Sequence, residues 1–254
     1  MEIRAQRTDL IDSLSPLTAA LGRNATNPCV EFIAFDADGD RLTATANDLS
    51  MSITVTLPAT ILTSGRICVK GAKLLQALEK FGKDDVCLTA ADDAPEARLS
   101  CGKAGITIPA LPYENFTMPK APAEGGTVLT LPARTIKSML QRVQYASGVN
   151  DTRVILNGTY LCAGAQGLTA VCCDGFRMAK ISDTCPELPG EDVGVIIPRA
   201  TAAELAKLLP AGEKDKSEKV RILISGPAMG VHILPAEENT TETYFVMPVR
   251  LRSA

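Results

Sequence analysis

The sequence contains little of the chemistry from which enzyme active sites are built. Its 254 residues include one histidine, His232, in an apolar strand pattern that favours a structural role over general-base catalysis. Without His232 no Ser/His/Asp or Cys/His set can be assembled, and the cysteines lack metal-ligand spacing. We therefore expect no catalytic residues, no metal site and no cofactor. An enzyme with an unrecognised site is the least favoured alternative, which a bound metal or nucleotide would reveal.

Long apolar runs and paired cysteine motifs are also missing. No segment approaches the ~18 continuous apolar residues of a membrane span, and no secretory leader is evident. The eight cysteines include no C-x-x-C pair and mostly fall in strand-like apolar runs, which favours reduced thiols over disulfides. These absences predict a soluble, cytoplasmic protein without a membrane partner.

A large net charge of either sign is absent as well. The formal net charge is −3, which argues against indiscriminate binding to nucleic acid but allows a basic surface confined to one face. The hydrophobic content of 46% is enough to build the core of one large domain or of two ordinary ones.

An internal repeat decides between one domain and two. The run Leu-Thr-Ala at 42–44 and Asp48 recur as Leu-Thr-Ala at 168–170 and Asp174, and the apolar spacing at 10, 14 and 17 recurs at 136, 140 and 143. We therefore predict two copies of one unit, residues 1–120 and 127–254, joined by a Pro- and Gly-rich connection. Apolar periodicity predicts helices over 8–21, 71–81, 132–146 and 200–209 among many strands, with Pro16 disturbing the first helix. Each copy is thus expected to be α+β, with two helices covering one sheet face.

Two apolar stretches suggest a binding slot. The end of the chain, 244–251, is apolar and is interrupted by Pro248, and the strand-like segment 168–179 contains the tight turn Asp174–Gly175. Together they could wall a shallow hydrophobic slot with a polar rim, as a peptide-docking site requires. In this arrangement Val246, Met247 and Leu251 line the groove.

These motifs resemble a known family when they are taken in order. The run Asp-Gly-x-Arg-x-Ala at 174–179, the segments 151–158 and 195–199, and the final Val-Met-Pro-Val-Arg-Leu are similar to the bacterial DNA polymerase III β subunit, the family of sliding clamps. The N-terminal third is similar through 21–23 and 47–51, so the resemblance covers essentially the whole chain and implies a DNA-clamp fold. The family carries three domains per chain, whereas this chain has room for two.

The resemblance implies two sets of binding residues. The peptide-binding set is Leu156, Cys173, Gly175, Phe176, Arg177, Met178, Val246, Met247, Pro248, Val249, Arg250 and Leu251. Phe176 and Cys173 stand where the family has histidine and threonine, so the slot is expected to be more apolar. The second proline-bearing wall that the family supplies near its domain junction is expected to be absent. The DNA-binding set takes Arg23, Asn150 and Arg199 from the family, and Lys73, Lys80, Arg134 and Lys137 from the polar helix faces.

The function that the resemblance implies is that of a processivity factor. Such a protein encircles double-stranded DNA and tethers DNA polymerase and clamp-loader subunits through short peptide motifs. If each domain turns the ring by about one sixth, three copies of a two-domain chain close it as a head-to-tail homotrimer. The alternative is a clamp-derived binding module that docks clamp-binding peptides without encircling DNA.

Overall fold

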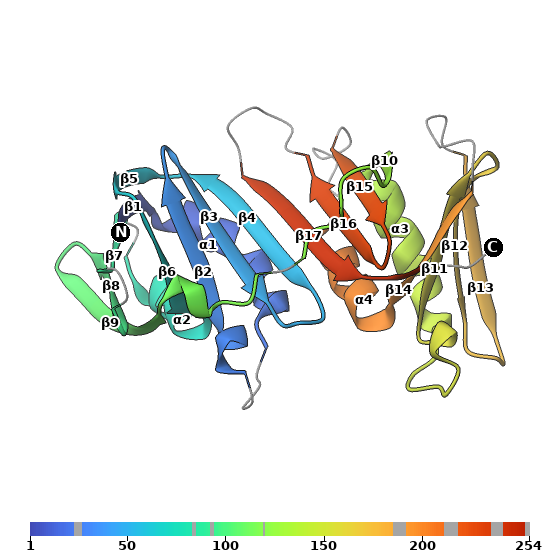
Figure 1. The fold of residues 1–254 in the computed structure, drawn as a ribbon, viewed down its shortest axis with the longest axis horizontal. Coiled ribbons are helices and arrows are strands. Elements are labelled where there is room, and N and C mark those ends of the chain that lie inside the picture. Colours follow the sequence, from blue (N-terminus) through green and yellow to red (C-terminus); the bar gives the residue numbers. More distant parts are fainter. Residues whose placement is uncertain are drawn as a thin grey trace. The chain divides into compact units, whose positions relative to one another are not determined.

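The computed structural model describes residues 1–22, 27–82, 85–91, 94–118, 120–184, 192–210, 218–234 and 241–251. The chain divides into two compact units (Figure 1). The first comprises Met1–Pro119 and Glu237–Tyr244, and the second comprises Lys120–Ala236 and Phe245–Ala254.

The first unit contains two helices and nine strands in the described residues. In chain order these are β1 (Glu2–Gln6), α1 (Arg7–Leu14), β2 (Phe32–Asp38), β3 (Arg41–Asn47), β4 (Ser52–Pro58), β5 (Thr60–Thr63), β6 (Gly65–Lys70), α2 (Gly71–Lys80), β7 (Asp85–Thr89), β8 (Glu96–Cys101) and β9 (Ala104–Leu111). Strand pairing follows the order β4-β3-β2-β6-β9-β8-β7-β1-β5. The first predicted helix is shorter than expected, because α1 ends at Leu14 and a 3₁₀ segment, Ser15–Ala20, carries Pro16 in its first turn, where its missing N–H breaks no α-helical bond.

The second unit repeats this plan. Its elements are β10 (Thr127–Pro132), α3 (Ala133–Val143), β11 (Gly158–Gly164), β12 (Gly167–Cys173), β13 (Met178–Asp183), β14 (Val193–Pro198), α4 (Arg199–Leu208), β15 (Lys219–Ser225), β16 (Ala228–Ile233), the residues of β17 (Glu242–Pro248) from Phe245 onward, and β18 (Arg250–Leu251). One run of strands is ordered β10-β15-β16-β17, and a five-stranded sheet is ordered β13-β12-β11-β14-β18. The predicted α+β class, with two helices in each repeat, is confirmed.

The helices pack in pairs against the sheets of their own unit. In the second unit α3 and α4 contact each other, α3 contacts β12 and β13, and α4 contacts β11 and β14. Ile136, Met139, Leu140 and Val143 of α3 are buried at the spacing that places them on one helix face. None of the helices in the described ranges combines the length and the apolar character that crossing a bilayer requires.

Candidate peptide-docking groove

The floor of the candidate groove is a row of side chains that crosses neighbouring strands of the five-stranded sheet. Antiparallel pairing sets Val171 opposite Tyr160, Tyr160 opposite Ile196, and Ile196 opposite Arg250. Directly opposed residues point to the same sheet face, so these four side chains share one face. Their strand neighbours, such as Leu161, alternate to the other face and are buried. The sheet therefore has an apolar row on the face that does not form the core.

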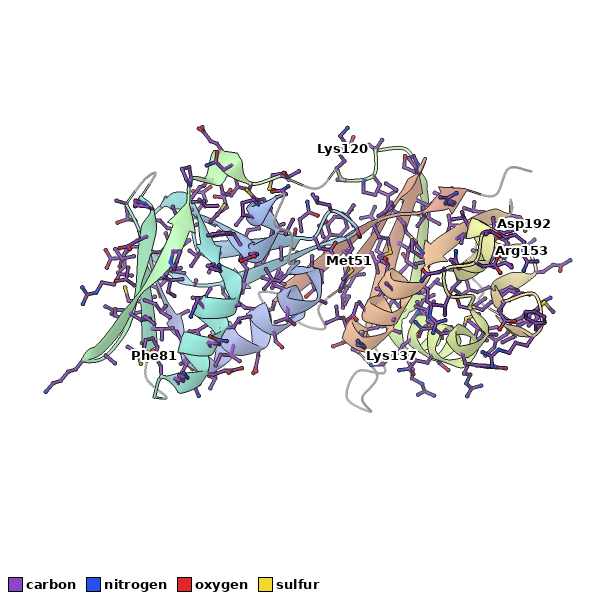
Figure 2. The ribbon with its side chains drawn as sticks, turned by 90° about the horizontal axis from the view of Figure 1, so that it is seen from below. Met51, Phe81, Lys120, Lys137, Arg153 and Asp192 are labelled. Atoms are coloured by element: carbon purple, nitrogen blue, oxygen red, sulfur yellow. The ribbon has the colours of Figure 1, made fainter. Side chains whose placement is uncertain are left out.

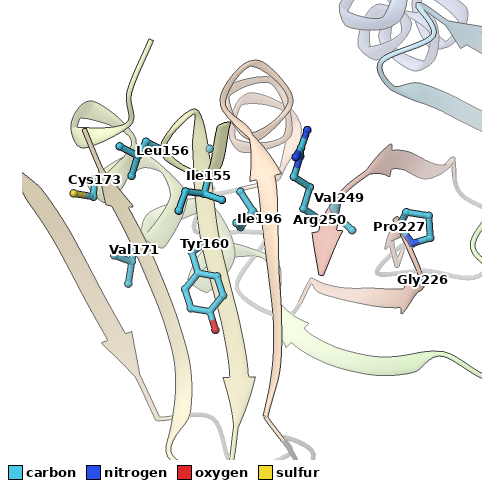
Figure 3. A pocket seen from close by; sticks show the side chains of 11 residues that line it. Ile155, Leu156, Tyr160, Val171, Cys173, Ile196, Gly226, Pro227, Val249 and Arg250 are labelled. Atoms are coloured by element: carbon cyan, nitrogen blue, oxygen red, sulfur yellow. The ribbon is translucent and has the colours of Figure 1, made fainter. Parts of the chain in front are cut away.

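The walls enclose a cavity of about 780 Å³ above this row (Figure 3). All of its lining residues belong to the second unit. They are Ile155, Leu156, Gly158, Tyr160, Val171, Cys173, Ile196, Gly226, Pro227, Val249 and Arg250. The lining is mainly aliphatic, with one aromatic ring and one cation, which is the composition typical of a site for apolar side chains.

One wall joins the end of the chain to the turn between β15 and β16. The Val249 N–H donates to the Pro227 carbonyl oxygen at 2.8 Å, and β18 pairs with β14. Gly226 has a φ of +55°, a left-handed conformation that glycine adopts in turns without steric cost. Pro227, in this turn, is the proline of the cavity lining.

The opposite wall is the loop over residues 147–157, which carries Ile155 and Leu156. The Asn157 side chain bridges the loop, accepting from Asp151 N–H at 2.9 Å and donating to the Asp151 carbonyl oxygen at 2.8 Å. The Arg199 guanidinium donates to the carbonyl oxygens of Ser147, at 2.7 Å, and Gly148, at 3.5 Å. Arg199, at the start of α4, therefore holds one end of the wall.

Removing this guanidinium is expected to weaken the wall. Arg199→Gln should lower the free energy of unfolding by about 2 kcal/mol, because a charged donor to a partly buried carbonyl is lost. Urea unfolding measures this change, with Arg134→Gln as the control, since Arg134 is exposed on α3. Equal stability of the two variants would contradict the anchoring role of Arg199.

Two Asp–Arg pairs lie beside the groove. Arg153 binds Asp151 through two guanidinium nitrogens, each at 3.1 Å, and this hydrogen bonding lowers the pKa of the Asp151 carboxyl. In the β12–β13 turn, the pKa of Asp174 is lowered first by the backbone N–H groups of Arg177 and Phe176 and then by the Arg177 side chain. Both arginines are thus neutralised by a carboxylate of their own loop.

The turn itself depends on glycine. Gly175 has a φ of +89°, and a Cβ added there would approach Nη2 of Arg153 to 2.6 Å. The Arg177 guanidinium lies over the ring of Tyr145, 5.7 Å from its centroid. The turn is consequently packed against the 145–153 segment through its own Arg177, over Tyr145, and through Arg153 of that segment, beside Gly175.

The predicted peptide-binding residues have three different placements. Leu156, Cys173, Val249 and Arg250 line the cavity. Gly175, Phe176, Arg177 and Met178 form the adjacent turn and the start of β13, with Phe176 99% exposed. Val246, Met247 and Pro248 do not line it.

The buried tail residues require a correction. Met247 is 1% exposed and Val246 is 8% exposed. Both were expected to line the groove, but both are buried in the core. The reason is that β17 lies in the sheet beside β16, so the apolar tail fills the interior before it reaches the groove at Val249. The side chain of Leu251 lies outside the described residues, although its backbone pairs with Val195.

Most of the residues that line the cavity were not predicted from the sequence. The unpredicted lining residues are Ile155, Gly158, Tyr160, Val171, Ile196, Gly226 and Pro227. A signal was available in β12 and β14, where apolar side chains occupy both alternating sets of positions, as in Ile196 and Ile197. Strands of that kind are typical of a sheet that is covered on both faces.

The predicted DNA-binding residues fall into two groups, one exposed to solvent and one bound to backbone carbonyl oxygens, and one further residue lies outside the described ranges. Lys73, Lys80, Arg134 and Asn150 are exposed, and Arg23 lies outside the described residues. Lys137, labelled in Figure 2, is half-buried, and its Nζ is not free as expected but donates to the Leu209 carbonyl oxygen at the end of α4 at 2.6 Å. Arg199, likewise, is engaged with backbone carbonyls of its own unit. The packing of α3 on α4 gives Lys137 its partner, and the loop that follows α3 gives Arg199 its partners.

Two family models match the chain. The N-terminal domain of the DNA polymerase III beta subunit matches residues 1–120, and the central domain of the same subunit matches residues 130–243. Between them the matches take in both units. The chain belongs to the DNA polymerase III β subunit family. The resemblance stated from the sequence motifs is therefore confirmed.

Curated relatives of this β-subunit family member are beta sliding clamps. The clamp of Caulobacter vibrioides is 30% identical over 220 residues, which cover 84% of this chain and 59% of the relative. The clamp of Streptomyces coelicolor is 25% identical over 239 residues, covering 93% of this chain and 61% of the relative. The chain thus spans about three fifths of the length of these relatives.

Solved clamp structures share the fold. A sliding clamp from Bacillus subtilis superposes with a TM-score of 0.85 at 21% identity, over 100% of this chain and 66% of that one. A clamp from Pseudomonas aeruginosa bound to griselimycin superposes with a TM-score of 0.84 at 22% identity, over 98% and 64%. The fold is accordingly the DNA-clamp fold that the sequence predicted.

Proposed function

We propose that this chain acts as a DNA sliding clamp that tethers DNA polymerase and clamp-loader subunits by peptides docked in the groove. The observation that carries the proposal is the 780 Å³ cavity, whose walls join the end of the chain to the body of the same unit. That volume is of the size that small ligands and peptide side chains occupy. The names of the curated relatives, beta sliding clamps, support the same assignment. We propose no catalytic activity.

The chemistry of the groove suits leucine or phenylalanine side chains. Val171, Tyr160 and Ile196 offer an apolar floor on which such side chains lose contact with water. The exposed Phe176 adds apolar surface next to the cavity. Docking then depends on shape and burial, with polar rim groups orienting the peptide.

Contact with DNA is proposed to be loose. The exposed Lys73, Lys80, Arg134 and Asn150 have long or polar side chains that can approach phosphates without reading bases. Lys137 and Arg199 contribute less, because their donors are already used. A duplex retained in this way can slide through a closed ring.

Ring closure requires other copies of the chain. Among the described strands β13 pairs with β12 alone, so its other edge offers N–H and C=O groups to a second copy. If six domains close the ring, three two-domain chains supply them head to tail. We therefore propose a homotrimer.

Light scattering of the purified chain tests the assembly. The expected particle has a mass near three times 26.8 kDa. In a separate loading assay, we expect this particle to be retained on circular DNA and to slide off after the DNA is cut. A monomer at micromolar concentration that still binds peptide contradicts the ring. That result favours the alternative, a clamp-derived module that docks peptides without encircling DNA, which is possible because every lining residue lies in one unit.

A further inference from the structure

The apolar row on the groove floor ends in a cation on both sides. Strand pairing sets Lys180 of β13 opposite Val171, so the row runs Lys180, Val171, Tyr160, Ile196, Arg250 across the sheet. Opposed residues share a face, so Lys180 and Arg250 both lie on the face of the groove. In Figure 3 the guanidinium group of Arg250 and the hydroxyl of Tyr160 point in opposite directions.

Neither of these cations has an acidic partner in the described part of the chain. The six ion pairs found there do not include Lys180 or Arg250, and both residues are exposed. The nearby Arg153 and Arg177, by contrast, each have an aspartate. The row therefore carries two positive charges that no described carboxylate pairs with, Arg250 in the cavity lining and Lys180 on the same face, one strand beyond Val171 and outside the lining.

Carboxylates on the same face lie away from the row. Asp192, just before β14, is four residues from Ile196 and so about 13 Å along the chain, and the carboxylates of Asp174 and Asp151 beside the groove are already paired with Arg177 and Arg153. The other groove-facing residues of β11, β12 and β14 are uncharged, among them Thr169, Cys162 and Gly194. The charge of the floor is thus complementary to an acidic ligand.

We infer that the peptide docked in the groove carries acidic side chains on both sides of its apolar anchor residues, one facing Arg250 and the other Lys180. This inference rests on the proposed docking function. The two ends of the row are four strand spacings apart, about 19 Å, and an extended peptide advances about 3.3 Å per residue. The two acidic residues are therefore about five to six positions apart, with the apolar anchors between them.

Two labelled peptides that differ only in charge test the inference. The probes are Gly-Asp-Ser-Leu-Leu-Phe-Asp-Gly and the same peptide with both aspartates replaced by asparagine, measured by fluorescence anisotropy at low and high salt. The acidic peptide is expected to bind about 10-fold more tightly at low salt, since each partly exposed ion pair contributes roughly 3-fold. The difference should shrink as salt screens the pairs.

Protein variants assign the preference to the two cations. Lys180→Gln and Arg250→Gln are each expected to reduce the preference about 3-fold, and the double variant should abolish it. Arg142→Gln removes an exposed cation of α3 and should leave the preference unchanged. Equal binding of both peptides to the natural protein would overturn this inference while leaving the docking function intact. Binding of neither peptide would overturn the docking function and the inference with it.

Discussion

Cys173→Arg is expected to weaken binding of the neutral asparagine peptide at least ~100-fold, a loss of about 2.7 kcal/mol. Cys173 lines the cavity at the end of β12, and its sulfur accepts the Gly175 N–H at 3.3 Å. A guanidinium at this position fills the space meant for apolar side chains. A docked peptide would also remove it from water without an acidic partner, which costs several kcal/mol.

The matched control is Thr169→Arg. Thr169 lies on the same strand and, by alternation, on the same face as Cys173, but it does not line the cavity. This variant adds the same charge and bulk outside the groove and should retain natural affinity. If Cys173→Arg binds the peptide as tightly as Thr169→Arg does, the cavity is not the docking site.

Met247→Ala is expected to lower the free energy of unfolding by about 3 kcal/mol, because truncating a fully buried methionine leaves a cavity in the core. Met247 is 1% exposed on β17, and its neighbour Phe245 is 1% exposed as well. Urea unfolding measures this loss directly. At urea concentrations below the unfolding transition, peptide affinity per folded molecule should change little, since Met247 does not line the groove.

Phe176→Ala is the contrasting variant. Its ring is 99% exposed in the β12–β13 turn, so its removal should change stability by no more than about 0.5 kcal/mol. Unchanged stability of Met247→Ala, together with a loss of peptide binding, would restore the groove-lining role that the sequence pattern predicted for Met247.

The element order was accessible from the sequence because it depends on local periodicity. Apolar residues in 132–146 recur at the spacing of one helix face. The structure places α3 at Ala133–Val143 and buries these residues. The repeat of Leu-Thr-Ala marks β3 and β12, which hold corresponding places in their sheets. Only the first helix is cut short, where Pro16 stops the α-helical hydrogen bonding.

The groove could be predicted only in part. The motif residues Leu156, Cys173, Val249 and Arg250 belong to it. Pro227 could not be found, because the β15–β16 turn reaches the groove only through the hydrogen bond from Val249. Lys137 and Arg199 appear in sequence as free cations, and only the tertiary structure reveals the carbonyl groups that they bind.

The sequence by itself determined the family, the fold class and the positions of α2, α3 and α4, since these follow from motifs and from periodic burial along the chain. The tertiary structure alone decided which side chains face the groove. That choice depends on the register between strands distant in sequence, which sets Lys180, Val171, Tyr160, Ile196 and Arg250 in one row. It also depends on the order of the sheet, which buries Met247 and brings Val249 to the surface of the cavity.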